Sequence, residues 1–281
     1  MKLCDLHTHS VYSDGTYTPA ELLIAAEKLG LSAVALTDHN CVDGLREFLS
    51  AAKGSGVEAI PGVEFSTAYG DKELHLVALC IRERYFSEIA EMMADGKKRK
   101  EQSNIELVRA LCAAGYKLDY EKIRASSPGG NINRAHIAAE LTSLGYTKSR
   151  EHAFETLLAP ESGFYKAPKR MDFFETIRYI RSIGAVPVLA HPFLKLSEEE
   201  LTVLLPKAKE SGLCAVECYY STHDAKQTET AFRLADRFGL KYSGGSDFHG
   251  GNKPDIRLGV GKGDLKIPYS FLETLREEIR I

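Results

Sequence analysis

The 281-residue sequence has no tryptophan, no Cys-x-x-Cys pair and no apolar run near the ~20 residues that a membrane-spanning helix needs. The first residues, MKLCDLHTHS, become polar at once, so we expect no signal peptide, no membrane association and a cytoplasmic protein. The six cysteines lie in apolar segments, which indicates buried free thiols rather than disulfides. A formal net charge of −3 argues against a nucleic-acid coat protein. No feature indicates an obligate protein partner.

Strand-like and helix-like segments alternate along most of the chain. Helix-start signals separate them, such as Thr18, Pro19 and Glu21 before one apolar run and Ser197 before another. This alternation predicts an α/β fold with a mainly parallel sheet, and seven strands favour barrel-like closure over an open sheet. The predicted strands are 2–7, 31–40, 57–67, 72–81, 185–192, 213–220 and 240–250.

The alternation stops between residues 86 and 168, where no strand-like segment occurs. A long helix with a charged middle is followed by three shorter helical segments. We therefore expect a catalytic barrel of residues 1–85 and 169–281, with a helical insertion, 86–168, that forms a lid over the site. The basic run Lys97–Lys100 is typical of a solvated helix face, and contact with an anionic ligand is the alternative.

Histidines and carboxylates gather at the ends of the predicted strands. The C-terminal ends of parallel strands lie on one face of an α/β fold, where active sites form. Residues i and i+2 of an extended segment point to the same side, so His7 with His9, and Asp247 with His249, are expected to act as chelating pairs. The candidate metal ligands are His7, His9, Asp14, His39, Glu64, His75, His191, Asp247 and His249.

Each of these motifs alone has a plainer explanation. A lone His-x-His often satisfies a hydrogen bond, Asp38 could cap the next helix, and His75 lies early in its strand. Glu64, however, follows the apolar run AIPGV, which is an unusual place for a solvated charge. Because six of the nine histidines and three carboxylates are expected at one rim, a metal centre is favoured.

The segments DLHTHSVYSDG, ALTDHN, PGVEFS, ELHLVAL, LAHP and GSDFH resemble, in order, the motifs of the PHP (polymerase and histidinol phosphatase) family of metal-dependent phosphoesterases. The resemblance implies a distorted (β/α)7 barrel around up to three metals. It assigns one metal to His7, His9, Glu64 and Asp247, and a second, bridged by Glu64, to His75 and His191. It assigns a third to Asp14, His39 and His249, although some members have histidine where this chain has Asp14.

Imidazole and carboxylate ligands without thiolate suit two to three divalent ions of Mn, Fe or Zn. Bound metals lower the pKa of water, and the resulting hydroxide would attack phosphorus in a phosphate ester. We therefore expect a metal-dependent phosphoric ester hydrolase with Glu64, Asp247 and His191 as catalytic residues. The general acid stays open between His136, His223 and water.

Five residues are candidates for substrate binding. Arg134 and His136 begin a helix of the insertion, Tyr165 and Lys166 lie where the chain returns to the barrel, and His223 follows the sixth strand. Each is also explained as a surface, linker or loop residue, and Asn133 as a helix cap. The surrounding segments resemble those of bacterial nucleoside 3′,5′-bisphosphate phosphatases, which implies a small phosphorylated substrate, a nucleotide or sugar phosphate, and short oligonucleotides as a further class.

Other functions fit parts of the pattern. The resemblance also covers phosphodiesterases that cleave both esters of cyclic ribose phosphates, and histidinol phosphate phosphatases. A non-catalytic, metal-stabilised binding domain is disfavoured because structural metal sites are usually thiolate-rich and closed. An amidohydrolase acting on C–N bonds typically needs a bridging lysine, and Glu64 occupies that position here.

Overall fold

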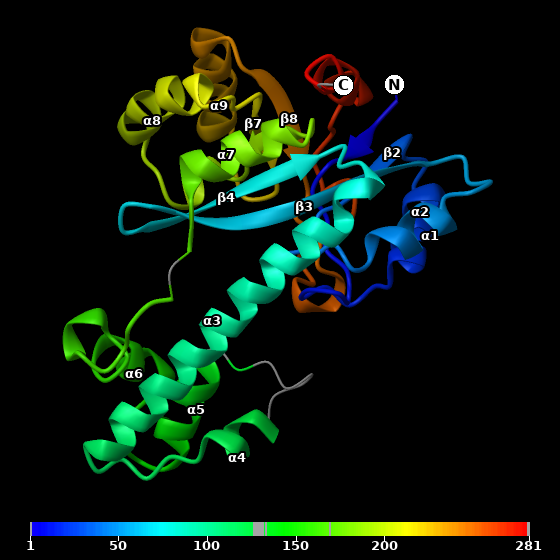
Figure 1. Ribbon diagram of the computed structural model, residues 1–281. Coiled ribbons are helices and arrows are strands. Elements are labelled where there is room, and N and C mark those ends of the chain that lie inside the picture. The colour runs from blue at the N-terminus through cyan, green and yellow to red at the C-terminus, as the bar shows by residue number, and fades with distance from the viewer. Residues whose placement is uncertain (1, 126–131, 133, 169, 280–281) are drawn as a thin grey trace. The chain divides into compact units, whose positions relative to one another are not determined.

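The computed structural model describes residues 2–125, 132, 134–168 and 170–279. It divides into two compact units, which we call the barrel unit (Met1–Glu91 with Arg170–Ile281) and the helical unit (Met92–Lys169). Figure 1 shows both. The boundary predicted at residue 85 coincides with the start of helix α3 (Phe86–Ala113), which begins in the barrel unit and continues into the helical unit.

A mixed β-sheet forms the centre of the barrel unit. All seven predicted strands are confirmed and are hydrogen-bonded in chain order. An eighth, β5 (Met171–Asp172), has no counterpart in the prediction and pairs with β3. The seven are β1 (Cys4–Asp5), β2 (Ala33–Leu36), β3 (Glu58–Tyr69), β4 (Lys72–Leu79), β6 (Val186–Leu189), β7 (Ala215–Tyr220) and β8 (Lys241–Gly245).

Strand β4 departs from the expected parallel order. It runs antiparallel to both β3 and β6, while the other strand pairs are parallel. The chain between β3 and β4 is a short turn, and a parallel pair would need a crossover of about a dozen residues. The reversal explains His75: an early position in an antiparallel strand lies at the same edge as the late positions of its parallel neighbours. His75 is accordingly paired with Ser66, near the end of β3.

The first and last strands meet, so the sheet is a nearly closed, distorted barrel. The Leu6 amide donates to the Gly244 carbonyl oxygen at 3.2 Å, and Thr8 forms a parallel bridge with Phe248. Gly245 permits this approach, because a Cβ atom at that position would collide with the Cβ of His7. The ends of β1 and β8 are therefore held side by side.

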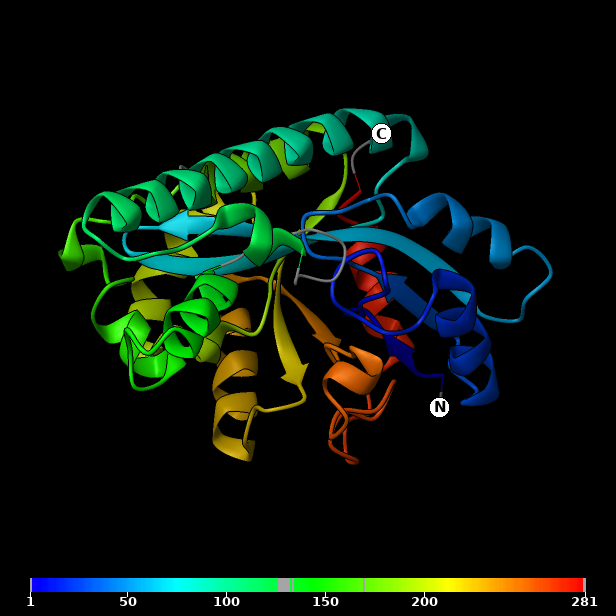
Figure 2. The same ribbon diagram turned by 90° about the horizontal axis from the view of Figure 1, so that it is seen from below.

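Helices pack around the strands and begin at the predicted signals. Figures 1 and 2 show α1 (Pro19–Lys28) and α2 (Leu45–Ala51) beside β2 and β3, and α9 (Ala225–Phe238) beside β7, with α8 (Glu198–Glu210) packed next to α9. Capping boxes start α1 at Thr18 and α8 at Ser197. Helix α7 (Phe173–Ser182) is also confirmed, whereas α10 (Tyr269–Arg276) was not among the predicted elements. Apolar residues between helices and strands form the core, including Leu6, Ile60, Val77, Val188 and Leu272.

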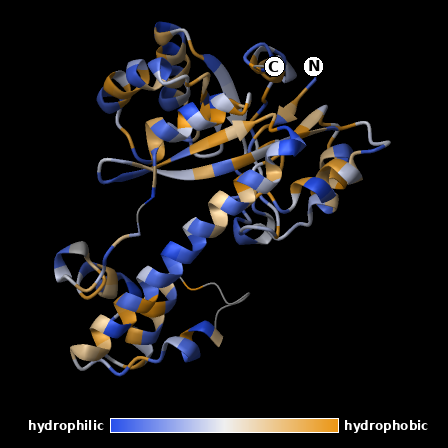
Figure 3. Ribbon diagram, in the orientation of Figure 1, coloured by the Kyte–Doolittle hydropathy of each residue, from blue (hydrophilic) through white to orange (hydrophobic). Residues whose placement is uncertain are grey.

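The helical unit has its own apolar core. It contains most of α3, followed by α4 (Tyr120–Ala125), α5 (Arg134–Ser143) and α6 (Arg150–Glu155), as the insertion was predicted to do. Leu107, Leu111, Ile137, Leu141 and Leu158 are fully buried there. Figure 3 shows a hydrophilic middle of α3, where the run of lysine and arginine lies. The function of this unit as a lid stays a prediction.

The structure bears on two expectations from composition, the absence of a membrane-spanning helix and the burial of the cysteines. Among the described helices, none is both long enough and apolar enough to cross a membrane. None of the six cysteines forms a disulfide, and Cys4, Cys41, Cys214 and Cys218 are buried as expected, while Cys80 is half-buried. The expectation of burial is wrong for Cys112, which is exposed near the end of α3.

The substitution Gly245→Ala should destabilise the barrel unit. The added methyl group must displace His7 and open the contact between β8 and the end of β1. Overpacking of this kind costs about 1–3 kcal/mol, to be measured as the free energy of unfolding in urea. Gly56→Ala is the matched control, because the nearest atom to a Cβ there lies 3.9 Å away. Equal stability of the two variants would contradict this account of barrel closure.

Candidate metal centre

All nine predicted ligands converge at one edge of the barrel unit. Three of them follow β1 and two follow β8, while β2 and β6 are each followed by one, and β3 and β4 each carry one within the strand. Three overlapping groups offer ligand atoms that lie within 4.8 Å of one another. The groups are His7, His9 and Glu64; His39, Glu64 and His75; and His9, Asp14, His39 and His249.

The Glu64 carboxylate lies at the centre of this cluster and is fully buried. Its Oε1 atom is 2.7 Å from His75 Nδ1 and 2.9 Å from His191 Nε2. Its Oε2 atom faces three other imidazoles, His39 Nδ1 at 2.8 Å, His7 Nε2 at 3.3 Å and His9 Nε2 at 3.4 Å. The two oxygens thus serve separate sets of histidines, an arrangement that suits a bridging ligand.

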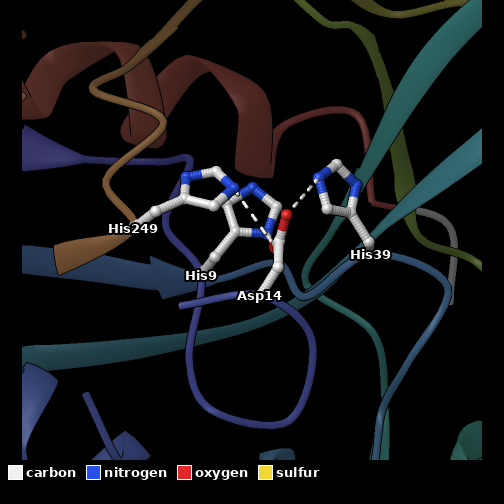
Figure 4. Close-up of side chains that lie close together, drawn as sticks. All are labelled: His9, Asp14, His39 and His249. Carbon is white, nitrogen blue, oxygen red and sulfur yellow. Dashed lines mark ion pairs between the residues drawn. The ribbon is translucent and has the colours of Figure 1, made fainter. Parts of the chain in front are cut away.

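A second group surrounds Asp14 at the outer side of the cluster. Figure 4 shows His9, His39 and His249 turned toward the Asp14 carboxylate. Asp14 Oδ1 lies 3.2 Å from His249 Nε2, and Oδ2 lies 3.8 Å from His39 Nε2. Asp14 is 55% exposed while the rings of His9 and His249 are buried, so this side of the cluster opens to solvent.

Asp247 divides its two oxygens between the cluster and the protein. Oδ1 lies 3.1 Å from His9 Nε2 and 3.7 Å from His7 Nε2. Oδ2 instead accepts hydrogen bonds from the Tyr220 hydroxyl at 2.9 Å and the Lys253 ammonium at 2.7 Å. Only Oδ1 is therefore directed at the other candidate ligands.

The donor set fits divalent metal ions. Six buried ligand atoms have no hydrogen-bond partner despite lying close to one another, and buried polar atoms are rarely left in that condition. Their lone pairs converge on common points, where cations would satisfy them together. Nitrogen and oxygen donors without sulfur are typical of Mn, Fe and Zn sites. The six are His7 Nε2, His9 Nε2, His39 Nδ1, Glu64 Oε2, Asp247 Oδ1 and His249 Nε2.

Carboxylate and imidazole groups in the cluster set each other's charge. Burial works to raise the pKa of Glu64, but the charges of His7, His75 and His39 hold it well below its usual value. Burial works to lower the pKa of His75, yet the Glu64 carboxylate outweighs it and raises that pKa to about 9. At His9 burial dominates and lowers the pKa to about 3. Glu64 thus remains an anion that favours bound positive charge.

Backbone strain is concentrated around the ligands. Among the described residues, four non-glycine residues have positive φ, and three of these are in or beside the cluster. His191 has φ of 27°, Asp247 of 56° and Asn40, next to His39, of 47°. Such conformations persist only where surrounding contacts enforce them, and they are frequent at functional sites.

Two buried aspartates hold the ligand loops in place. Asp5 accepts hydrogen bonds from the amide of Ser246, at 2.9 Å, and from the amide of Gly259, at 2.8 Å, and so anchors the loop after β8. Asp38 accepts from the Ser10 amide at 2.7 Å and the Ser13 hydroxyl at 2.6 Å, and so anchors the loop after β1. Asp38 therefore ties two ligand loops together, which replaces the alternative that it caps a helix.

Three residues of the site were not predicted: Glu217, Tyr220 and Lys253. Glu217 is 2% exposed and lies within β7, where its carboxylate contacts His7 and His191. A charged residue inside the apolar segment LCAVECYY was the available signal for it. Tyr220 and Lys253 had no comparable signal, because their role depends on the contact with Asp247.

The predicted substrate residues lie in both units. In the helical unit the Arg134 guanidinium stacks on the ring of Tyr165, 4.2 Å from its centroid, and also faces Phe154. His136 lies in α5, and Lys166 lines a surface groove with Lys98 and Arg99. Asn133 lies outside the described residues. The role of these residues toward a substrate stays a prediction.

His223 lies in the barrel unit, beside the residues that hold Asp247. Its ring packs between Phe193 and Tyr220, each centroid 5.2 Å away. Its Nδ1 atom is 3.3 Å from the Cys218 carbonyl oxygen, and burial lowers its pKa. Its contact with a substrate stays a prediction.

A cavity of about 160 Å³ opens beside the cluster. This volume is below the roughly 300 Å³ at which pockets begin to enclose a drug-sized ligand. The cavity itself accommodates a group of phosphoryl size, and a larger ligand would extend beyond it. Its lining includes His75, His191, Pro192, Tyr220, Asp247 and Lys253.

Comparisons with known proteins place this geometry in context. Residues 5–164 match the PHP domain. The chain is 31% identical over 250 residues to a 5′-3′ exoribonuclease of Haemophilus influenzae, covering 88% of this chain and 90% of the relative. It is 30% identical over 251 residues to a 3′,5′-nucleoside bisphosphate phosphatase of Chromobacterium violaceum, covering 87% and 86%.

A solved structure has the same fold. It is that of a protein from Bifidobacterium adolescentis assigned as a metal-dependent phosphoesterase, and it superposes with a TM-score of 0.73 at 27% identity. The superposition covers 100% of this chain and 97% of that one. The likeness therefore extends over the barrel and the insertion alike.

The substitution Glu64→Gln should abolish tight metal binding. The neutral amide offers one acceptor instead of two and turns an NH₂ group toward one set of histidines. We expect the dissociation constant for Mn²⁺ to rise at least about 100-fold, since outer partners of metal ligands alone are worth roughly 10–100-fold. Calorimetric titration measures this. Glu58→Gln is the control, because Glu58 begins the same strand but pairs with Arg276. Unchanged Mn²⁺ affinity in Glu64→Gln would contradict the assignment.

Proposed function

The chain belongs to the PHP family, whose fold and metal-dependent phosphoesterase chemistry it shares, and we propose that it hydrolyses phosphate monoesters of small nucleotides of the 3′,5′-bisphosphate type. The observation that carries the chemistry is the buried Glu64 carboxylate among five imidazoles, with unpaired ligand atoms facing common points. The substrate class is supported by similarity to the Chromobacterium violaceum phosphatase.

We assign two to three divalent ions of Mn, Fe or Zn to the site. His7, His9, Glu64 and Asp247 would hold one ion, Glu64, His75 and His191 a second, and Asp14, His39 and His249 a third. When bound, such ions lower the pKa of water toward neutrality and offset negative charge on phosphoryl oxygens. Support comes from the three overlapping groups of ligand atoms, which include seven of the nine residues. His191 and Asp247 join them through contacts with Glu64 at 2.9 Å and His9 at 3.1 Å.

The chain's own groups complete the site. Glu64 and Asp247 stay ionised, because neighbouring histidines hold both pKa values below their usual range against the effect of burial. His191 is directed at the cluster from a strained backbone at the end of β6. Lys253 brings a cation to the cavity wall, 2.7 Å from Asp247, where it would attract a phosphoryl oxygen.

We further propose that residues 86–168 act as a lid that binds the part of the substrate remote from the reacting phosphate. Support comes from each unit separately. The cavity of the barrel unit encloses only about 160 Å³, and in the helical unit Arg134 is held in place by aromatic stacking. A guanidinium fixed in this way is suited to bidentate recognition of a phosphate group.

A second candidate function is favoured by one observation. The Haemophilus influenzae relative is a 5′-3′ exoribonuclease, which supports short RNA as a second candidate substrate class. The same centre would then cleave a phosphodiester bond in place of a monoester. The two functions differ in the leaving group and share the metal ligands.

Phosphate release from adenosine 3′,5′-bisphosphate in the presence of Mn²⁺ tests the proposal. We expect turnover by the wild type and a loss of at least about 100-fold in kcat for Asp247→Asn, because the variant loses an anionic ligand. Asp71→Asn, in the exposed turn before β4, is the control and should remain active. If the protein cleaves short RNA or a cyclic ribose phosphate but not the bisphosphate, the phosphoesterase activity stands and the proposed bisphosphate substrate is rejected.

Metal removal separates a catalytic centre from a structural one. Because the barrel unit has an extensive apolar core of its own, the chelated protein should keep its far-ultraviolet circular dichroism while activity disappears. Its melting temperature should fall, since bound metal stabilises the native state by mass action. Added Mn²⁺ should restore activity. Unfolding on chelation at room temperature would instead indicate a metal-stabilised domain.

A further inference from the structure

One buried carboxylate contacts two of the candidate metal ligands without facing the cluster itself. Glu217, in β7, is 2% exposed. Its Oε1 atom is 3.1 Å from His7 Nδ1, and its Oε2 atom accepts the backbone N–H of His191 at 2.7 Å. No described contact directs either oxygen at the points where the ligand atoms converge.

The His7 contact determines which ring nitrogen is available for a metal. A carboxylate only accepts hydrogen bonds, so His7 Nδ1 must carry a proton to bond with Glu217. The other nitrogen, Nε2, is then left to bind a cation. That atom is 3.3 Å from Glu64 and has no hydrogen-bond partner, as a metal ligand requires.

The His191 contact acts on the backbone rather than on the ring. His191 has φ of 27°, which a non-glycine residue adopts only when other contacts compensate for the strain. The hydrogen bond from its N–H to Glu217 supplies such a contact at the strained residue itself. The ring is thereby directed at Glu64, with Nε2 at 2.9 Å.

We infer that Glu217 is a positioning residue of the metal centre, which sets the tautomer of His7 and the backbone of His191 with one carboxylate. This inference rests on the proposed metal centre. The two ligands lie on different segments, His7 after β1 and His191 after β6. Among the described residues, no other carboxylate contacts both His7 Nδ1 and the backbone N–H of His191. Partners of this kind typically change metal affinity by roughly 10–100-fold when they are replaced.

The substitution Glu217→Gln is a sharp test because both partners of Glu217 are donors. An amide has one oxygen and one NH₂ group, so in either orientation the NH₂ group meets a donor. If it faces His7, the ring must move its proton to Nε2 and lose its ligand atom. If it faces His191, the backbone hydrogen bond that stabilises the strained residue is lost. Either outcome weakens metal binding while the size of the side chain is unchanged.

The measurement is Zn²⁺ binding by the full chain, in competition with a chromophoric chelator. Glu217→Gln should raise the dissociation constant of at least one Zn²⁺ ion 10–100-fold. Cys218→Ala is the matched control, since Cys218 is the next residue of β7 and is fully buried. It should bind Zn²⁺ like the wild type. Equal Zn²⁺ affinity in wild type and Glu217→Gln would overturn the inference.

A second readout needs no variant and does not depend on activity. In the Zn²⁺-loaded wild type, long-range ¹H–¹⁵N correlation should show His7 with a protonated, hydrogen-bonded Nδ1 and a metal-bound Nε2. Metal binding through His7 Nδ1 would overturn the inference even if Glu217→Gln failed to fold. Absence of Zn²⁺ and Mn²⁺ binding by the wild type would reject the proposed metal centre itself. If the wild type binds metal and Glu217→Gln binds it with the same affinity, only the role of Glu217 is rejected.

Discussion

The site depends on the burial of one negative charge, the Glu64 carboxylate, inside a ring of imidazoles. An ionised carboxylate taken out of water is strongly destabilising unless other charges or hydrogen bonds compensate. Here five histidines from four other segments lie within 3.4 Å of its oxygens. Without it, His7, His39 and His75 would lose the negative charge that raises their pKa values. The Glu64 carboxylate and the imidazoles therefore stabilise one another, and bound metal ions would be ligated by both kinds of group.

The barrel provides the geometry that this charge arrangement requires. The first and last strands must meet for His7 and Asp247 to lie side by side, and Gly245 allows this close approach. Three buried carboxylates then fix the ligand loops by accepting hydrogen bonds from their backbone amides. They belong to Asp5, Asp38 and Glu217. The strained backbone at His191 and Asp247 is tolerated because these contacts are made within a packed core.

Chemistry and substrate recognition are expected to come from different parts of the chain. The barrel unit carries all nine candidate ligands and a cavity fit for a phosphoryl group. The helical unit has a separate core and carries Arg134 and Tyr165 in direct contact. Relatives named for different substrates are compatible with this division, since residues of an inserted unit can change without disturbing the ligands.

The seven main strands, the helical insertion and all nine candidate ligands are predictable from the amino-acid sequence. Most of the ligands lie at strand ends, and four of them form i, i+2 pairs, which are local properties of the sequence, while His75 is supported by the resemblance of ELHLVAL to a family motif. The antiparallel course of β4 is apparent only in the folded structure, and it brings His75 to the site from an early position in its strand. Glu217, Tyr220 and Lys253 likewise emerged only there. Their roles depend on partners that register and barrel closure bring within hydrogen-bonding distance, such as His7, which is 210 residues from Glu217.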